Sequence, residues 1–259
     1  MASSFEKFRD LHYQKNLLLI GNVWNVQSAL LYEQAGFGAI ATSSVAVAQS
    51  LGYEDGEDMP FNDYLFIIKR IMKSVKLPVS VDLEAGYGDT AEKIISNILK
   101  LIDLGVAGIN IEDSLVKGTK RIIQDAGLFT DKLRKITDAL KSEGAEIYMN
   151  VRCDAYILGL SDPLQETKKR IKLYETANVD GMFLPFIVKE DDISAIVQFT
   201  KLPLHVMCMP GLPGFKSLQE FGVKRISMGG YVYRNVYQHM EKLTKEIVAQ
   251  QNFDSLFNH

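Results

Sequence analysis

Eight short apolar runs recur along the chain, and a segment of helical periodicity follows each of them. The runs are Leu17–Ile20, Ala39–Thr42, Val79–Asp82, Gly108–Glu112, Ile147–Arg152, Gly181–Pro185, Leu204–Met207 and Arg225–Met228. Short apolar strands that alternate with helices form a parallel sheet covered on both faces. Eight such units in 259 residues favour a closed (β/α)₈ TIM barrel. A doubly wound Rossmann-type sheet is the alternative, but no G-x-G-x-x-G motif follows the first run.

The helical segments complete a single domain over residues 1–259, with an N-terminal helix and a C-terminal helical extension. Helices are expected at Phe5–Asn16, Val26–Gln34, Phe61–Val75, around Ile94–Ile102, at Leu128–Ser142, from Asp162 to about Ala177, and at Asp191–Phe199, Ser217–Phe221 and Val232–Gln250. Asp89 is the expected N-cap of the helix around Ile94–Ile102. The stretch Ser114–Gly127 has little periodicity and is long for a connection, so we expect a mobile loop.

Charge and composition argue against several classes of partner. The net charge is −3 and the basic residues form no stripe, so nucleic acid is not an expected partner. No apolar run reaches about 18 residues, so no membrane span is expected. The stretch Met1–Asn16 lacks the apolar core of a signal peptide. The two cysteines, Cys153 and Cys208, indicate no disulfide framework and fit a reducing cytoplasm.

Two acids follow the third strand on one side of the chain. Asp82 and Glu84 are two residues apart, and in an extended chain such side chains share a face, roughly 7 Å apart. Gly86 and Gly88 then leave room beside the backbone. Carboxylate oxygens suit a hard cation such as Mg²⁺, or Mn²⁺ in its place. An isolated D-x-E pair is most often solvated, so this assignment depends on the rest of the chain.

Polar residues gather at the carboxyl ends of the predicted strands, where TIM barrels have their active sites. They are Asn22, Thr42, Ser43, Ser44, Asp82, Glu84, Glu112, Asp113, Arg152, Asp154 and Ser227. Arg152 is expected to bind a substrate carboxylate or phosphonate, or else to serve as a counterion of Glu112. Ser43 and Ser44 stand where a helix start cradles an anion with backbone N–H groups, or where they simply cap the helix. His205 is interpreted as a core residue.

Seven ordered motifs extend over nearly the whole chain, roughly from Phe5 to Tyr233. They are GNVWN at Gly21–Asn25, AGFGAIATSS at Ala35–Ser44, SLGYEDGE at Ser50–Glu57, VDLEAGYGD at Val81–Asp89, GINIEDS at Gly108–Ser114, NVRCDAY at Asn150–Tyr156 and RISMGG at Arg225–Gly230. Together they resemble the isocitrate lyase/phosphoenolpyruvate mutase superfamily, in particular its phosphoenolpyruvate phosphonomutase-like members. The resemblance implies a (β/α)₈ barrel whose last helix is exchanged between subunits of a homodimer or homotetramer. It also implies Mg²⁺ and a small α-oxo or α-hydroxy carboxylate as substrate.

The resemblance assigns roles to individual residues. Asp82 corresponds to the direct metal ligand, and Glu84 and Glu112 correspond to outer ligands that act through water. The substrate-binding residues implied are Thr42, Ser43, Ser44 and Arg152. The catalytic residues implied are Asp55, Lys117, Thr119 and Arg152. Ser114–Gly127 corresponds to a mobile lid, within which Lys120 competes with Lys117 as the lid lysine.

The chain departs from the lyase branch of the superfamily at this lid. That branch has a Lys-Lys/Arg-Cys-Gly-His pattern, whereas the lid here reads SLVKGTKRIIQDAG, with neither Cys nor His. Thr119 stands where the mutase branch has Asn, and Phe186 follows the sixth strand where the lyases have Glu. Asn25 replaces an Asp that is usual in similar relatives. The sequence therefore predicts an enzyme other than a cysteine-dependent isocitrate lyase.

Three functions are compatible with these residues. The first is a Mg²⁺-dependent enzyme that cleaves or forms a C–C or P–C bond next to a small α-oxo acid, such as oxaloacetate or phosphonopyruvate. The second is a barrel that binds such acids with lost or altered turnover. The third, a Schiff-base aldolase, needs a desolvated lysine at a strand end, and none of the eight predicted ends has one.

Overall fold

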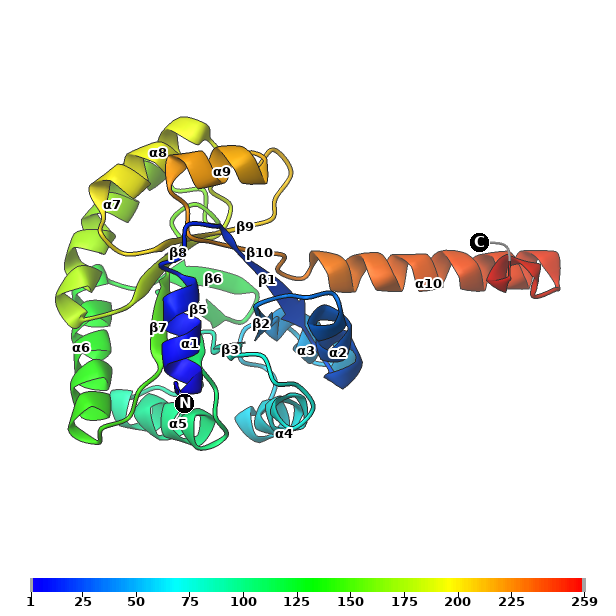
Figure 1. Cartoon of the computed structure of the whole chain (residues 1–259), viewed down its shortest axis with the longest axis horizontal. Helices are drawn as coiled ribbons and strands as arrows, with labels where there is room; N and C mark the ends of the chain where they lie inside the picture. The colour runs from blue at the N-terminus through cyan, green and yellow to red at the C-terminus, as the bar shows by residue number, and fades with distance from the viewer. Residues whose placement is uncertain (1, 258–259) are drawn as a thin grey trace.

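Eight parallel strands close into a barrel in the computed structural model, which describes residues 2–257 (Figure 1). The barrel strands are β1 (Leu18–Val23), β2 (Ala39–Thr42), β3 (Val79–Asp82), β4 (Gly108–Glu112), β7 (Tyr148–Arg152), β8 (Gly181–Leu184), β9 (Leu204–Met207) and β10 (Arg225–Ser227). They are neighbours in this order, and β10 pairs with β1 to complete the ring. The predicted (β/α)₈ architecture is confirmed, and the open Rossmann-type sheet is wrong because an open sheet leaves two edges.

Helices follow the barrel strands and surround them (Figure 1). The helices are α1 (Ser4–Leu11), α2 (Val26–Gln34), α3 (Ser44–Leu51), α4 (Phe61–Met72), α5 (Ala91–Asp103), α6 (Ala126–Ser142), α7 (Pro163–Tyr174), α8 (Glu190–Phe199), α9 (Phe215–Phe221) and α10 (Tyr231–Gln250), with short 3₁₀ turns at Glu175–Ala177 and Asp254–Leu256. The expected Asp89 cap of α5 is wrong. Thr90 is the N-cap, because its extended backbone places its hydroxyl to accept the Lys93 N–H at 3.3 Å.

Helix α1 covers the barrel on the side of the strands' N-terminal ends. Ser3 and Glu6 form a capping box, and the helix ends at Leu11, earlier than the expected Asn16. Phe8 is fully buried and packs edge-on against Tyr148 at a ring distance of 5.5 Å. A side chain at Gly108 would lie 2.7 Å from the Phe8 ring, so glycine makes room for this packing. One aromatic side chain therefore anchors α1 to the barrel.

The stretch expected to be an irregular loop contains a β-hairpin. Strands β5 (Ser114–Lys117) and β6 (Lys120–Ile123) pair antiparallel, and α6 begins soon after them. The two-residue turn between them places Gly118 at φ 61°, a left-handed conformation that favours glycine. The sequence SLVK–KRII gave little indication of strands, because each strand has only four residues. Lysine also ends the first strand and begins the second, on either side of the turn.

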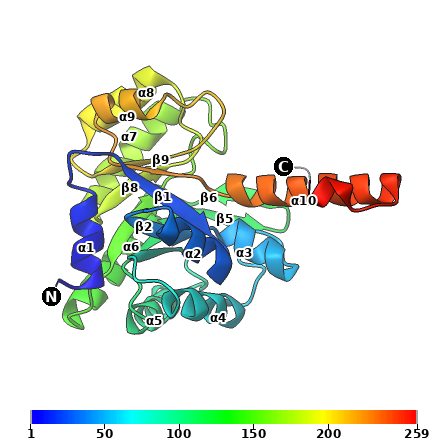
Figure 2. The ribbon, with the colours of Figure 1, turned by 45° about the vertical axis from the view of Figure 1, so that its right-hand side comes forward.

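Helix α10 leaves the barrel and projects into solvent (Figures 1 and 2). Trp24 packs edge-on against Tyr233 at a ring distance of 5.3 Å and fixes the root of the helix. Farther along, Val236 and Met240 are 49% and 59% exposed, so an apolar stripe lies uncovered. A cavity of about 870 Å³ with apolar walls lies beside the root, between α10 and the residues that precede α9. Within residues 2–257, no helix has the length and hydrophobicity needed to cross a bilayer.

Candidate active site

A cavity of about 260 Å³ lies at the carboxyl ends of the barrel strands. Its polar lining consists of Asn22, Ser43, Ser44, Asp55, Asp82, Asn110, Arg121, Arg152, Ser227 and Arg234. Phe183, Pro185 and Met207 contribute apolar walls from the side of β8 and β9. The larger cavity beside α10 has no such convergence of acids and cations. The smaller cavity is therefore the candidate active site, as the predicted strand ends indicated.

Asp82 is held at the end of β3 with one carboxylate oxygen free. Its Oδ2 accepts a hydrogen bond from the Ser44 hydroxyl at 2.8 Å, and its Oδ1 is buried without a hydrogen-bond partner among residues 2–257. The backbone is fixed as well, because the Asp82 N–H donates to Thr42 Oγ1 at 3.0 Å and the Tyr64 hydroxyl donates to the Asp82 carbonyl at 3.0 Å. Thr42 thus supports Asp82 from outside the cavity lining, whereas Ser44 reaches into the cavity.

The first turn of α3 offers backbone donors to the cavity. Ser43 is the N-cap, but its side chain makes no capping hydrogen bond, so simple capping does not explain this serine. The first N–H groups of a helix have no intrahelical acceptor. Ser43, Ser44 and Val45 all line the cavity, so this helix start fits the predicted cradle for an anion.

Glu84 faces a closed network behind the cavity. It has φ 51°, a left-handed conformation that turns its side chain away from the line of β3. Its carboxylate accepts hydrogen bonds from the Tyr87 hydroxyl and from the Glu57 N–H, both at 2.9 Å. Burial, followed by the charges of Asp55, Glu112 and Asp82, raises the pKa of Glu84 well above its usual value. Glu84 therefore contributes to the electrostatics of the site from outside the cavity lining.

Arg152 stands opposite Glu112 in the β4–β7 register and pairs with two acids. Its Nη1 lies 2.7 Å from Glu112 Oε2, and its Nε and Nη2 donate to the two oxygens of Asp154 at 2.6 and 3.1 Å. Arg152 is a counterion of Glu112, as one of the two interpretations expected, and it also lines the cavity, where its binding of a substrate stays a prediction. Burial, offset in part by Arg152, raises the pKa of Glu112.

Arg121 is a site residue that the sequence analysis missed; it lines the cavity from the hairpin. From β6 it pairs with Glu112, with Asp154 at 3.2 Å and with Asp55 at 3.4 Å. It also donates to the Ser114 hydroxyl at 2.9 Å. The hairpin is thereby tied to the barrel wall by one guanidinium group. The sequence indicated Arg121 only through its position next to Lys120 in the predicted lid. The direction of the Arg121 side chain depends on the register of the hairpin, which the sequence pattern did not reveal.

The predicted lid residues lie at the exposed tip of the hairpin. Lys117, Thr119 and Lys120 are all exposed, and the cavity lining includes none of them in this conformation. Their catalytic assignment stays a prediction that requires the hairpin to move.

Two further residues that line the cavity, Tyr231 and Arg234 at the root of α10, were missed by the sequence analysis. The Arg234 guanidinium lies 4.4 Å from the centre of the Tyr231 ring. Arg234 forms no ion pair in the part of the chain that the structure describes.

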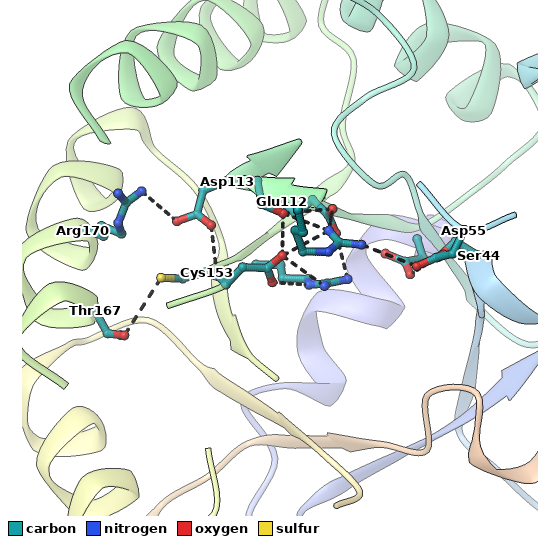
Figure 3. Close-up of polar contacts among 12 residues, drawn as sticks. Ser44, Asp55, Glu112, Asp113, Cys153, Thr167 and Arg170 are labelled. Carbon is teal, nitrogen blue, oxygen red and sulfur yellow. Dashed lines mark hydrogen bonds and ion pairs between the residues drawn. The ribbon is translucent and has the colours of Figure 1, made fainter. Parts of the chain in front are cut away.

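A buried network behind β4 positions the loop that carries Asp154 (Figure 3). Asp113 accepts the Asp154 N–H at 2.9 Å, Arg170 Nη1 at 3.1 Å and the Tyr174 hydroxyl at 2.7 Å. Cys153 is fully buried beside it, with its sulfur 4.0 Å from Thr167 Oγ1, and burial raises the pKa of this thiol well above its usual value. These residues support the site from outside the cavity and expose no thiolate to it.

The acids fit a divalent cation, although they do not form a preformed cage. Within residues 2–257 no group of three or more His, Cys, Asp or Glu side chains has the arrangement of a metal site. Mg²⁺, however, keeps several waters and takes only one or two carboxylates directly. The free Oδ1 of Asp82 offers one such ligand, and the mutual repulsion of Asp55, Asp82, Glu84 and Glu112 leaves negative charge to be neutralised.

Comparisons with known proteins identify the family to which the chain belongs. Oxaloacetate decarboxylase 1 of Pseudomonas fluorescens is 30% identical over 86% of this chain and 77% of its own length, and 2-methylisocitrate lyase of Aeropyrum pernix is 26% identical over 93% and 79%. A crystal structure of a proposed phosphonomutase from Burkholderia cenocepacia superposes with a TM-score of 0.87 at 32% identity, over 93% of this chain and 99% of that one. The family model described as phosphoenolpyruvate phosphomutase matches residues 8–248. The chain therefore belongs to the phosphoenolpyruvate phosphomutase family, within the superfamily that includes the isocitrate lyase-type enzymes.

Proposed function

We propose that this protein is a Mg²⁺-dependent enzyme that cleaves or forms a C–C or P–C bond next to the carbonyl of a small α-oxo acid. The substrate class is an oxo acid with a second anionic group, such as oxaloacetate or phosphonopyruvate. The observation that carries the proposal is the free Oδ1 of Asp82, which is buried at a cavity that Arg152 and Arg234 also line. A cation ligand and two guanidinium groups around one small space match a substrate with two anionic ends.

Different residues of the cavity are placed to bind the two anionic groups of the proposed substrate. The N–H groups at the start of α3 and the Arg152 guanidinium are placed to hold the carboxylate next to the carbonyl. Arg234 has no acid partner among residues 2–257, so it is available to the second anionic group. A cavity of about 260 Å³ accommodates an acid of this size.

Bond cleavage then transfers an electron pair to the carbon next to the carbonyl. In the decarboxylation of oxaloacetate, for example, the bond to the distal carboxylate breaks, carbon dioxide leaves, and the electron pair becomes the enolate of pyruvate. A divalent cation bound at Asp82 supplies Lewis-acid stabilisation of the enolate oxygen. Arg152 adds positive charge from the end of β7, two strands away from Asp82, and the hairpin that carries Arg121 limits the access of water.

A cysteine general acid has no place in this scheme. Cys153 is buried behind the cavity, and Cys208 lines the separate apolar cavity beside α10. The proton that completes the reaction comes from solvent or from a hairpin residue, for which Lys117 or Lys120 and Thr119 are the candidates when the hairpin moves. The proposed chemistry is accordingly distinct from cysteine-dependent isocitrate cleavage.

The test measures turnover of oxaloacetate and of phosphonopyruvate with Mg²⁺ and with the metal chelated. We expect metal-dependent turnover of one of them, and we expect Arg234→Met to raise KM at least tenfold with a smaller effect on kcat. Arg70→Met, at an exposed arginine on α4, is the matched control and should leave both constants unchanged. Binding of oxalate with Mg²⁺ in calorimetry, without turnover of either acid, would instead support the binding barrel that lacks catalysis.

A further inference from the structure

Arg225 is a fully buried arginine inside the barrel. It begins β10, and strand alternation places it on the same face as Ser227, which lines the active-site cavity. Its Nε, Nη1 and Nη2 are buried and have no hydrogen-bond acceptor among residues 2–257. Its Cζ lies 5.5 Å from the centre of the Phe8 ring. Arg225 therefore points toward the end of the barrel that α1 covers, away from the substrate cavity.

The other inward or buried arginines are paired with acids. Arg121 and Arg152 contact Glu112 and Asp154, and Arg170 contacts Asp113. Within residues 2–257 the contact given for the Arg225 guanidinium is the face of Phe8, while Tyr148 and the carboxylate of Asp82 act on it electrostatically without a hydrogen bond or ion pair. Burial lowers the pKa of Arg225 to about 10, so the side chain still carries its charge at pH 7. An unpaired buried charge costs far more free energy than the ring returns.

A second polar group without a partner lies in the same region. His12, just after α1, stacks on Tyr148 at a ring distance of 4.2 Å and interacts electrostatically with Arg225. Its Nδ1 donates to the Phe8 carbonyl at 2.8 Å, which leaves its buried Nε2 without a partner. The Tyr148 hydroxyl is already engaged, because it donates to the Asp180 carbonyl at 3.0 Å. Burial, followed by the charge of Arg225, lowers the pKa of His12 to about 3, so this ring is neutral and its Nε2 is an acceptor that lacks a donor. The polar side chains of this region therefore supply no negative charge in contact with Arg225, and the deficit that needs an anion belongs to Arg225 alone.

We propose that Arg225 binds a small inorganic anion of halide size inside the barrel, beneath α1. A water molecule would supply an acceptor but would leave Arg225 without a negative charge in contact, whereas an anion supplies both to this guanidinium. The surroundings favour a monatomic ion, because Phe8, Leu18 and Tyr148 belong to one apolar cluster that closes this end of the barrel. The site is distinct from the substrate cavity, whose own cations are Arg121, Arg152 and Arg234.

The covering helix makes the exchange of this anion depend on a local opening. Helix α1 has eight residues, and Phe8 is its one buried residue, with Phe5 and Leu11 packed around it. Local opening of such a short terminal element costs much less than global unfolding. The anion therefore enters by displacement of α1, and it stabilises the closed position of that helix when bound.

The direct test is crystallography of the full chain in sodium bromide. We expect an anomalous bromide peak within hydrogen-bonding distance of the Arg225 guanidinium, at an occupancy that survives transfer to a low concentration of bromide. An ordinary water peak there without anomalous signal would overturn the proposal. A peak lost at low bromide would be an adventitious ion only and would overturn it equally.

A solution test uses thermal unfolding at constant ionic strength. Replacing sodium gluconate with sodium chloride or bromide should raise Tm by roughly 2–4 °C, because the small anion binds the folded state alone. Arg225→Met should lose this halide-dependent increment, Arg225→Lys should retain part of it, and the exposed-site control Arg70→Met should keep it whole. An equal halide increment in Arg225→Met would contradict the proposal. If that variant fails to fold, the bromide experiment on the unaltered chain decides the question.

Discussion

Arg121 of the hairpin and Glu112 of β4 form an ion pair that joins a locally folded β-hairpin to the wall of the barrel. Glu112 is almost fully buried, and the same carboxylate also pairs with Arg152 at 2.7 Å. The hairpin is otherwise exposed at its turn. The position of the proposed lid thus depends on a charge contact made within the candidate active site, where the proposed cation and anionic substrate would also act.

We predict that Arg121→Met releases the hairpin. Removing one partner of a buried ion pair leaves acids uncompensated, at a cost of about 3–5 kcal/mol in buried settings. Amide hydrogen exchange over Leu115–Ile122 should therefore speed up at least tenfold, while exchange in β4 stays slow. The exposed Lys120→Met is the control and should leave the hairpin as it is. Equal protection of the hairpin in both variants would show that Arg121 does not hold it.

We predict that Asp82→Asn abolishes the binding of Mg²⁺ and Mn²⁺. The amide cannot offer the charged oxygen that Oδ1 presents to the cavity, but it preserves shape and the contact with Ser44. Isothermal calorimetry with each metal measures the loss directly. Asp89→Asn, at an exposed acid farther along the same loop, should bind metal normally. Undiminished affinity in Asp82→Asn would remove the metal from this position.

We predict that the double variant Cys153→Ala/Cys208→Ala keeps its kcat within a few-fold on the best substrate. Neither thiol lines the active-site cavity, and burial keeps the Cys153 thiol protonated. Steady-state kinetics on the folded, metal-loaded variant provide the measurement. A loss of more than about 100-fold, roughly 2.7 kcal/mol in transition-state stabilisation, would mean that the chemistry requires a thiol.

We predict that Asp180 weakens the folded state as pH rises. Burial raises the pKa of Asp180 to about 6, although the Met149 N–H at 2.7 Å and the charge of Arg9 partly oppose the shift. Because the folded pKa lies above the unfolded value of 3.8, the stability that Asp180 contributes is full below pH 3.8 and is lost as pH rises through 6.

Asp180→Asn removes this titration while keeping an acceptor for the Met149 N–H. The difference in free energy of unfolding between variant and parent, measured by urea denaturation from pH 4 to pH 7, should therefore change by on the order of 2 kcal/mol in favour of the variant. A constant difference across that range would show that Asp180 titrates alike in the folded and unfolded states.

We predict that the protein is a homodimer or homotetramer assembled through α10. The exposed stripe of Val236 and Met240, together with the apolar cavity beside the root of the helix, leaves more apolar surface uncovered than a monomer normally shows. Light scattering at micromolar concentration should give a multiple of 29.1 kDa, and Met240→Lys should shift it toward the monomer. Gln238→Lys, about 200° around the same helix, is the control. A monomeric parent protein would disprove the prediction.

The barrel was predictable from the sequence because its signal is local. A fully buried strand such as Gly108–Glu112 is a short apolar run whatever its neighbours, so its bounds could be read directly. The hairpin was missed because its pairing is visible only in the cross-strand register, for instance between Val116 and Arg121. Its half-exposed strands contain polar residues that interrupt any apolar run.

The candidate site was predictable where strand ends determine it. Asp82 and Arg152 end barrel strands, so the topology alone brings them to one rim. Arg121 and Arg234 come from a hairpin and from a helix root, whose directions depend on tertiary packing. For Glu84, the strand rule predicted the position of the residue but not the direction of its side chain. Its position follows the strand rule, but its left-handed backbone turns the carboxylate into a network behind the cavity.

The first turn of α10 forms part of the candidate active-site cavity, whereas the rest of this 20-residue helix stands clear of the barrel. The helix is thus a rod about 30 Å long with Tyr231 and Arg234 at its inner end. Whatever seats the outer end restrains the tilt of the rod and with it the Arg234 guanidinium. If a second subunit seats the outer end, as predicted above, dissociation on dilution would free it, and the KM for the acid would rise as the enzyme concentration falls.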